Sequence, residues 1–555
     1  MSESEFPYPL RAPRSTPESR RGAKPNPRTE TIEGMRIDRD VEVPTRAGRS
    51  AQVDVYRPLS DEPVPVLIAW SPYGKHDPAP IGQIYPASGV LPEHMSDLVT
   101  FEGPDPVYWV PNGYALIIAD LPGTWYAKGP ASYLSPEEEA DEYDLIEWAG
   151  VQPWSTGKVG LTGVSYLTSS QWRVAALNPP HLAAISPWEG WTDTYREVAR
   201  HGGIPESWFW PYIQERWGAS TGQIEDLERE TREHPFFDDF WASKAADLES
   251  ITVPAYVVAS WTDQGLHTRG TLEGFRRMSS EWKRMVVHGR KKWAEYYLPE
   301  NVERQRAFFD QFLKGIDTGV DDWPAVRAEL RSGYYKGEDV VSTDWPLPEV
   351  EYRELYLDAA AGGLVVDAPT EEASATYHGL GDPFRAERVL FEHTFAERTD
   401  VIGHSRAVIW FEAPDAKDAD VFLGLFKRDA QGQLVPFPYY AQFEDGPVAL
   451  GWLRASHREL DAQRSTHFLP VLAHQRELPL ETDGPTRLDI EIWPSGTRFE
   501  AGESLVLVVQ GHDIKHYPKP LVYARHETDI NRGPQIVRTG GSHASHLVIP
   551  VLPSR

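Results

Sequence analysis

Short apolar runs alternate with helix-compatible segments over the first part of the chain. Such runs occur at 66–70, 115–119 and 255–260, each closely preceded by proline or glycine. Apolar runs of this length suit strands that are buried on both faces of a parallel sheet. Helices are expected around 137–149 and 302–313. The alternation predicts a doubly wound, mostly parallel α/β core over residues 31–195 and 251–325.

The pattern changes after about residue 345. Arg487–Trp493 alternates strictly, with Leu488, Ile490 and Ile492 on one side and charged residues on the other. Strict alternation is typical of a half-solvated antiparallel strand. Similar segments, separated by Gly, Pro and Asp, continue to the end of the chain. We therefore expect an all-β sandwich over residues 345–555.

Tryptophan is concentrated between the two halves of the core. Residues 188–217 contain five of the 20 tryptophans. One interpretation is core packing of a helical insertion at 196–250, and another is an aromatic-lined substrate pocket under a helical cap. The two are compatible. The pocket candidates are Trp188, Trp191, Trp208, Phe209 and Trp210.

Charge and composition exclude several functions. The 555 residues carry a net charge of −28, so nucleic acid and anionic membranes are not expected partners. Zero cysteines exclude disulfides, thiolate metal sites and a cysteine nucleophile. No window approaches the length of apolar sequence that a membrane helix needs, and no apolar segment follows Met1. We expect a soluble, cytoplasmic protein.

The first 30 residues have a distinct composition. They hold six prolines among arginines, serines and glutamates, with few apolar groups. Such a segment buries too little apolar surface to offset the entropy of ordering. Residues 1–30 are therefore predicted to be a flexible arm, or one that wraps the surface.

The most informative segment for chemistry is 159–168, Val-Gly-Leu-Thr-Gly-Val-Ser-Tyr-Leu-Thr. An apolar strand end leads into Gly163-Val-Ser165, and a helix-compatible stretch follows. A nucleophile elbow has this form, because the serine sits on a strained strand-to-helix turn that needs small neighbours. The helix N-terminus behind it offers N–H groups to an oxyanion. Ser165 is the candidate nucleophile.

Several motifs then resemble one family. The run 146–160, Ile-Glu-Trp-Ala-Gly-Val-Gln-Pro-Trp-Ser-Thr-Gly-Lys-Val-Gly, with Gly163-Val-Ser-Tyr-Leu167, is similar to the Xaa-Pro dipeptidyl-peptidase-like serine hydrolases of the CocE/NonD type. Further similar motifs, in the family's order, are Asp54-Val-Tyr-Arg-Pro58, Ser71-Pro-Tyr-Gly-Lys75, Pro187-Trp-Glu-Gly190, Phe308-Phe-Asp-Gln-Phe-Leu-Lys-Gly315, Thr528-Asp-Ile-Asn-Arg-Gly533 and Ser545-His-Leu-Val-Ile-Pro550.

The resemblance implies an α/β-hydrolase core, a helical cap, a C-terminal jelly-roll domain of the galactose-binding-like type and a Ser-Asp-His triad. Ser165 matches the nucleophile, and Asp263, in Ser260-Trp-Thr-Asp-Gln-Gly265, matches the acid. Tyr73 matches a tyrosine whose hydroxyl forms the oxyanion hole together with the backbone N–H of Tyr166. For Asp263 a helix N-cap, and for Tyr73 a purely structural role, are the alternatives.

The base is less clear. The family presents Gly-Pro-Trp-x-His after the last core strand, whereas this chain reads His288-Gly-Arg-Lys-Lys-Trp293-Ala. With Gly289 aligned to the family glycine, Trp293 stands at the histidine position. His288, at the strand end, is the favoured base. The main alternative for His288 is a structural role as a hydrogen-bonded histidine at the strand end. Lys292, which would have to be neutral, is a second candidate for the base. His267, just after Asp263, is a third, although structural packing on a helix is its expected role.

Three other positions depart from the family pattern. Its Arg-Asp-Gly reads Arg46-Ala-Gly48, its Asp-x-Arg-Gly reads Asp120-Leu-Pro-Gly123, and a glycine of the elbow helix is Thr168. Bonds around Asp120 are expected to be lost, and Thr168 is expected to crowd the start of the helix. Both changes are compatible with an altered substrate range or with decay toward an inactive fold.

The prediction is a serine hydrolase that cleaves a carboxylic ester, or an amide or Xaa-Pro-type peptide, through an acyl-enzyme on Ser165. The alternatives are a catalytically impaired binding protein and an acyltransferase. Glu189 and Asp193 lie where an anchor for a substrate amino group could stand. No cofactor or metal is expected, since His543 and His546 and the acidic loop 415–420 lack the geometry of metal sites. A small-molecule substrate is the expected partner, and a homo-oligomer stays open.

Overall fold

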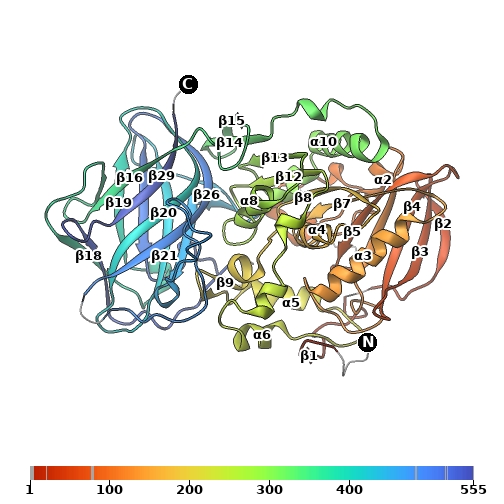
Figure 1. Cartoon of the computed structure of the whole chain (residues 1–555), viewed down its shortest axis with the longest axis horizontal. Helices are drawn as coiled ribbons and strands as arrows, with labels where there is room; N and C mark the ends of the chain where they lie inside the picture. The colour runs from red at the N-terminus through yellow and green to blue at the C-terminus, as the bar shows by residue number, and fades with distance from the viewer. Residues whose placement is uncertain are drawn as a thin grey trace.

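The structure is a computed structural model that describes residues 6–20, 22–76, 81–481, 484–518, 521 and 523–553. Figure 1 shows the C-terminal strands gathered at one end of an elongated molecule and the α/β half at the other. Helix α8 (Thr268–Arg277) and strand β26 (Thr486–Phe499) lie where the two halves meet.

A single twisted sheet forms the α/β half. Its strands lie side by side in the order β2-β3-β4-β6-β5-β7-β8-β12-β13-β14-β15. The pairs from β6 to β14 are parallel, as predicted. The bounds are β2 Arg28–Ile32, β3 Met35–Pro44, β4 Ser50–Pro58, β5 Val64–Ser71, β6 Ala115–Asp120, β7 Ser155–Val164, β8 Leu182–Trp188, β12 Ala255–Ser260, β13 Lys283–His288, β14 Val326–Gly333 and β15 Lys336–Ser342.

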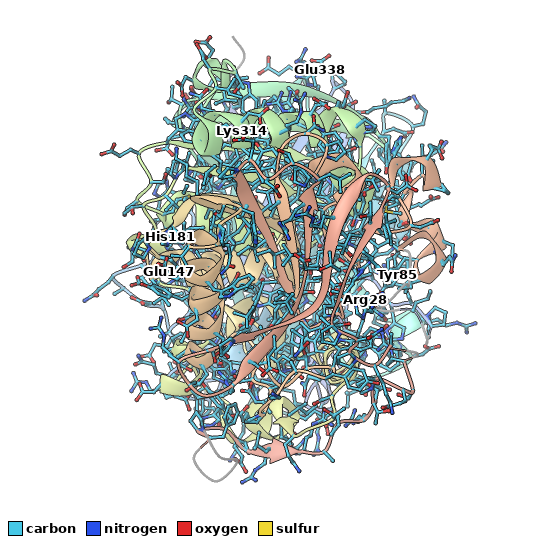
Figure 2. All side chains as sticks on the ribbon, turned by 90° about the vertical axis from the view of Figure 1, so that its right-hand side faces the viewer. Arg28, Tyr85, Glu147, His181, Lys314 and Glu338 are labelled. Atoms are coloured by element: carbon cyan, nitrogen blue, oxygen red, sulfur yellow. The ribbon has the colours of Figure 1, made fainter. Side chains whose placement is uncertain are left out.

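Helices connect the parallel strands. Ser135 caps the N-terminus of α3 by accepting a bond from the Glu138 N–H at 3.1 Å. Glu147 of α3 accepts bonds from the ring and backbone N–H of His181, just before β8, and Figure 2 shows the two side chains together. The bounds are α1 Ile81–Ile84, α2 Pro106–Trp109, α3 Pro136–Gly150, α4 Tyr166–Ala176, α8 Thr268–Arg277, α9 Lys292–Tyr296 and α10 Pro299–Phe309. None of the helices in the described ranges has both the length and the apolar character that spanning a bilayer requires.

The insertion between β8 and β12 contains short elements. They are β9 Arg200–His201, β10 Ile204–Pro205, α5 Phe209–Trp217, β11 Ile224–Glu225, α6 Leu227–Glu233 and α7 Asp239–Ser243. The N-terminal segment lies against this insertion. Strand β1 (Leu10–Arg11) pairs with β11, and Phe6 is buried. Residues 1–5 and 21 of the expected arm lie outside the described residues.

The C-terminal strands do not form the predicted two-sheet jelly roll. Their ladders close a nine-stranded barrel in the order β16-β29-β20-β26-β25-β21-β27-β19-β17, and β17 returns to β16. Two seams rest on one residue pair each, Gly451 with Ile492 and Gly363 with Glu392. Alternation along one strand identifies a strand but not its partners, so the sequence could not distinguish these arrangements.

The bounds of the C-terminal strands are β16 Glu351–Asp358, β17 Gly363–Val365, β18 Ala373–His378, β19 Arg388–Thr394, β20 Thr399–Glu412, β21 Asp420–Arg428, β22 Leu434–Val435, β23 Phe437–Tyr439, β24 Phe443–Gly446, β25 Ala449–Arg454, β26 Thr486–Phe499, β27 Ser504–Gln510, β28 Pro534–Thr539 and β29 His546–Leu552. In β26 the inward side chains Leu488, Ile490 and Ile492 are fully buried, as the alternation predicts.

A buried ion network joins the two halves. Arg269 of α8 donates to Glu197 at 2.7 Å and to Glu491 of β26 at 2.9 Å. The Arg269 side chain is only 3% exposed, so the attraction between these charges is weakly screened. Apolar residues of the C-terminal half, among them Tyr440 and Trp452, belong to the same buried cluster as the α/β core.

Replacing Arg269 with leucine should destabilise the protein strongly. The change leaves two buried carboxylates without their cation, so we expect the free energy of unfolding to fall by about 3–5 kcal/mol. The control is Arg277→Leu on the same helix, whose partner Glu249 is largely exposed, with an expected loss of about 1 kcal/mol or less. Unfolding followed by tryptophan fluorescence measures both, and equal losses would contradict the prediction.

Candidate active site

Ser165 stands on a strained turn between β7 and α4. Its φ is +62° and its ψ is −112°, a backbone conformation that L-residues rarely adopt. Gly163 precedes it with φ +135°, and a Cβ there would lie 2.3 Å from Leu167 Cδ2. The turn points the serine away from the strand end, as in a nucleophile elbow. The predicted elbow is present.

His267 is the histidine that meets Ser165. Its Nε2 lies 3.1 Å from Ser165 Oγ, and its Nδ1 bonds to Asp263 Oδ2. The backbone between Asp263 and His267 makes a tight turn, with Gly265 at a φ of +87° and the His267 N–H donating to the Asp263 carbonyl at 3.1 Å. This turn brings the two side chains into contact, so one short segment carries both groups.

The expectation that His288 meets Ser165 is wrong. His288 ends β13, and its Nε2 lies 3.1 Å from Glu189 Oε1. Glu189 in turn accepts a bond from Ser260 Oγ at 2.5 Å. Burial would lower the pKa of His288, but Glu189 outweighs burial and raises it. His288 is therefore held as the partner of a buried carboxylate.

Lys292 also lies beside Asp263 and His267, but its surroundings do not suit the role of a neutral base. Its Nζ donates to Asp263 Oδ2 at 3.0 Å and lies 3.1 Å from His267 Nδ1. Burial would lower the pKa of Lys292, but Asp263, Glu102 and Glu189 outweigh this and raise it. A lysine base must be neutral, so these charges oppose that alternative.

The surroundings of His267 keep its imidazole neutral. Burial, and then the Lys292 cation, lower the pKa of His267 to about 4, although Asp263 works in the opposite direction. Burial would raise the pKa of Asp263, but Lys292 and His267 together hold it below its usual range. The indole of Trp191 stacks on the imidazole at 5.5 Å between centroids, with 14° between the planes. A neutral, oriented imidazole can accept a proton from Ser165.

Tyr73 lies in the loop after β5. Its ring packs edge-on against Phe101 and Tyr166 at 4.8 and 6.2 Å, and burial raises the pKa of its hydroxyl well above 10. The hydroxyl is therefore protonated and can donate a hydrogen bond. Tyr166 is the first residue of α4, directly after Ser165.

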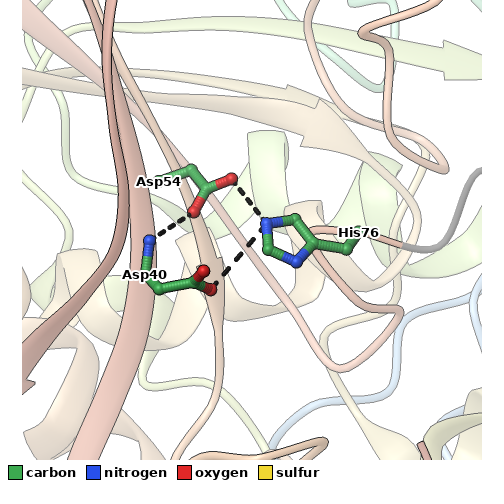
Figure 3. Close-up of side chains that lie close together, drawn as sticks. All are labelled: Asp40, Asp54 and His76. Atoms are coloured by element: carbon green, nitrogen blue, oxygen red, sulfur yellow. Dashed lines mark hydrogen bonds and ion pairs between the residues drawn. The ribbon is translucent and has the colours of Figure 1, made fainter. Parts of the chain in front are cut away.

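A charged cluster anchors this loop. Asp40, Asp54 and His76 lie close enough to share a cation, and Figure 3 shows them facing one another. The Lys75 ammonium bonds to Asp40, lies 3.0 Å from Asp54 Oδ1 and 3.1 Å from His76 Nε2. The protein's own cation thus occupies the place between these groups, so the cluster fits an anchor two residues from Tyr73 better than a metal site.

A small cavity of about 30 Å³ opens beside Ser165. Among the five expected pocket residues, Phe209 lines it. The other four lie elsewhere: Trp188 packs on Tyr296, Trp191 on His267, Trp208 donates to the Leu521 carbonyl, and Trp210 donates to Thr231. Composition could locate the aromatic cluster but not the direction of each ring. The cavity is lined by Tyr73, Tyr85, Phe101, Glu102, Ser165, Phe209, Ile213, Arg216, Leu266, Lys292, Trp293, Tyr440 and Gln442.

Known proteins show the same architecture. The family described as X-Pro dipeptidyl-peptidase (S15 family) matches residues 48–291, and the X-Pro dipeptidyl-peptidase C-terminal non-catalytic domain matches residues 318–548. A crystal structure of a CocE/NonD family hydrolase from Staphylococcus aureus is 40% identical, with a TM-score of 0.91, covering 96% of this chain and 98% of that one. The chain belongs to the CocE/NonD family of hydrolases. It is a serine ester or peptide hydrolase.

Two further relatives are more distant. Cocaine esterase from Rhodococcus sp. (strain MB1 Bresler) is 25% identical, with 92% of this chain and 98% of that protein covered. An α-amino acid ester hydrolase is 16% identical with a TM-score of 0.71, over 95% of this chain and 98% of that one, which shows a common fold.

This CocE/NonD hydrolase accommodates Thr168 without crowding. Thr168 Oγ1 lies 2.9 Å from the Gly163 carbonyl and 2.8 Å from the Trp188 carbonyl, and it accepts a bond from the Trp188 N–H at 2.7 Å. Gly190 leaves space for it, because a Cβ at Gly190 would lie 2.5 Å from Thr168 Cγ2. The threonine ties α4 to the ends of β7 and β8.

Asp120 also keeps a partner. It accepts a bond from the Lys75 backbone N–H at 2.7 Å, so the hydrogen bonding around it is not entirely lost with Pro122 in the family's arginine position. Burial raises the pKa of Asp120 to about 6.

Replacing Thr168 with valine tests its role in the elbow. Valine has the same shape but leaves the Trp188 N–H without its acceptor, so we expect a loss of about 1–3 kcal/mol in unfolding free energy and a lower kcat. Thr168→Ser, which keeps the hydroxyl, is the control and should lie close to the wild type. Denaturation and ester turnover are measured for both variants. An unfolding free energy and a kcat that are equal in Thr168→Val and Thr168→Ser would refute this role of the hydroxyl.

Proposed function

We propose that this hydrolase cleaves carboxylic esters through an acyl-enzyme on Ser165, with His267 as its base and Asp263 as the acid. The observation that carries the proposal is the contact of 3.1 Å between Ser165 Oγ and His267 Nε2, with Asp263 bonded to the opposite ring nitrogen. This arrangement has the roles of a serine hydrolase triad. It also removes the displaced histidine as a reason to expect an impaired binding protein.

The reaction begins as Ser165 Oγ attacks the ester carbonyl. His267 Nε2 accepts the hydroxyl proton, and the Asp263 carboxylate stabilises the imidazolium through Nδ1–H. The Tyr73 hydroxyl and the Tyr166 N–H are proposed to donate to the developing oxyanion. His267 then gives its proton to the leaving alkoxide, and a water molecule, deprotonated by His267, releases the acid from Ser165.

We further propose that residues 196–250 act as a cap over this chemistry. Phe209, Ile213 and Arg216 recur at positions i, i+4 and i+7 of α5, and all three line the cavity beside Ser165. The position of these side chains supports the cap interpretation, since a helix presents such positions on one face.

The triad assignment predicts which variants lose activity. Ser165→Ala and His267→Ala should lower kcat by about 10⁴-fold or more. A fluorophosphonate should add once to the wild type and to neither variant, as intact mass will show. His288→Gln is the control, because His288 pairs with Glu189 and not with Ser165. Labelling that persists in His267→Ala, or an absence of labelling in the wild type, would refute the assignment.

Burial of His267 and the nearby Lys292 cation predict activity in acid. His267 must be neutral to accept a proton, and its pKa of about 4 leaves it neutral above that pH. We expect kcat/KM to stay level down to about pH 4 and to fall below it. Removing the cation in Lys292→Met should raise the pKa of His267 and move the fall to higher pH.

The control for this measurement is Lys291→Met, one residue earlier. Lys291 pairs with the exposed Glu444 and with the Ala87 carbonyl, away from His267. Its pH profile should match the wild type. A Lys292→Met profile that keeps the wild-type acid limb, in a variant with an unchanged melting temperature, would contradict the proposed electrostatics.

A further inference from the structure

Arg216 brings a guanidinium group to the cavity beside Ser165. The residue is 8% exposed, and its Nε and Nη2 are buried with no hydrogen-bond partner among the described residues. Its guanidinium carbon lies 4.3 Å from the centre of the Phe101 ring and 5.6 Å from that of Tyr73. Stacking on aromatic faces orients the group but leaves its N–H donors unused. Buried donors without acceptors are costly, so this site is incomplete without another polar group.

Two further lining residues carry buried oxygens without a hydrogen-bond partner among the described residues. The Tyr440 hydroxyl is buried and without a partner among the described residues, and burial keeps it protonated by raising its pKa well above 10. Glu102 Oε2 is also unpartnered, while Oε1 accepts a bond from Trp293 Nε1 at 2.8 Å. A buried carboxyl group can protonate when donors are lacking, but a guanidinium cannot lose its charge.

The charge state of Glu102 favours an acceptor-bearing ligand as well. Burial raises the pKa of Glu102 to about 7, although Lys292, Trp293 and Arg216 oppose the shift. Near neutral pH a large fraction of Glu102 is therefore protonated and can donate a hydrogen bond. The cavity then presents donors from Arg216, Tyr440 and Glu102.

Glu189 and Asp193, considered above as anchors for a substrate amino group, already pair with other side chains of the protein. Glu189 lies 3.1 Å from His288 and accepts from Ser260. Asp193 pairs with Arg196 at 2.6 Å. The polar groups beside Ser165 that lack a hydrogen-bond partner are thus mainly donors. A ligand with acceptor oxygens would provide their partners.

We propose that Arg216 binds a carboxylate of the substrate, so that this hydrolase acts on esters that carry a carboxylate close to the scissile bond. The inference rests on the proposed esterase function of Ser165 and specifies its substrate class. A guanidinium recognises a carboxylate through two parallel N–H donors, which fixes the orientation of the ligand as well as its charge. Since Ser165 and Arg216 line the same cavity, the carboxylate is expected to follow the scissile group closely.

Matched esters test this substrate class. On the acyl side, 4-nitrophenyl hemisuccinate is compared with its methyl-capped succinate analogue. On the alcohol side, acetoxyacetate is compared with methyl acetoxyacetate. We expect the charged member of at least one pair to have a kcat/KM about tenfold higher in the wild type, and the pair that shows it locates the carboxylate. Glycine esters test the opposite charge, and a preference for them or for the neutral esters would overturn the proposal.

Variants then test whether Arg216 is the residue that recognises the substrate carboxylate. Arg216→Met should lower kcat/KM for the favoured charged ester at least tenfold more than for its neutral partner. Arg229→Met is the control, because Arg229 lies on α6 and pairs with the exposed Glu233. The control should keep the wild-type preference. Equal losses for charged and neutral esters in Arg216→Met would mean that the residue only supports the cap, which overturns the inference.

A binding experiment separates this inference from the esterase proposal. Succinate is titrated by calorimetry into Ser165→Ala and into Ser165→Ala/Arg216→Met, so that no turnover is needed. Binding that the Arg216 change weakens at least tenfold supports the carboxylate site even if no ester is cleaved. Fluorophosphonate labelling of Ser165 without succinate binding would leave the esterase proposal standing and overturn this one.

Discussion

The turn from Asp263 to His267 is the constraint on which the site depends. One tight turn carries both the proposed acid and the proposed base, so any rotation of this turn would displace the imidazole from Ser165. The C-terminal half holds the turn in place. Gln264 donates to the Pro494 carbonyl at 3.0 Å and accepts from the Leu450 N–H at 3.2 Å, and Gly265 leaves no room for a side chain against Ala524. A domain whose family is described as non-catalytic thus helps to position the catalytic turn.

The strained backbone at Ser165 is also held in place by contacts of neighbouring residues. A positive φ at a non-glycine residue costs about 1–3 kcal/mol and persists only where the surroundings dictate it. Here the Thr168 hydroxyl joins α4 to the ends of β7 and β8, and the Tyr166 hydroxyl donates to the buried Glu138 at 2.6 Å. The change from glycine to threonine in the elbow helix is matched by the space at Gly190, so it fits a retained elbow better than decay.

The sequence predicted the parallel core and the strand–turn–helix at Ser165, because each has a local signature: an apolar run and a Gly-x-Ser turn. Asp263, which the family resemblance indicated as the acid, is the carboxylate that bonds to His267. The sequence did not predict the barrel closure, because alternation along β26 does not identify β20 and β25 as its partners. The base was misplaced for a related reason. His288 and His267 both follow core strands, and only the packing of Glu189 against His288 shows that His288 is already engaged. The spacing of four between Asp263 and His267 was the available signal.

The charges around Asp263 explain how the proposed base can come from a different position in the sequence than the family's histidine. Trp293 stands at the position where the family has its histidine, and its indole donates to Glu102 at 2.8 Å. The neighbouring Lys292 supplies Asp263 with a fixed positive partner, which a buried carboxylate needs. With Asp263 stabilised by that cation, the imidazole is free to come from another element, provided that it approaches the same carboxylate oxygen. His267 does so from within the same turn. Burial and the Lys292 cation lower the pKa of His267, which suits a proposed base that must be unprotonated before the substrate reacts.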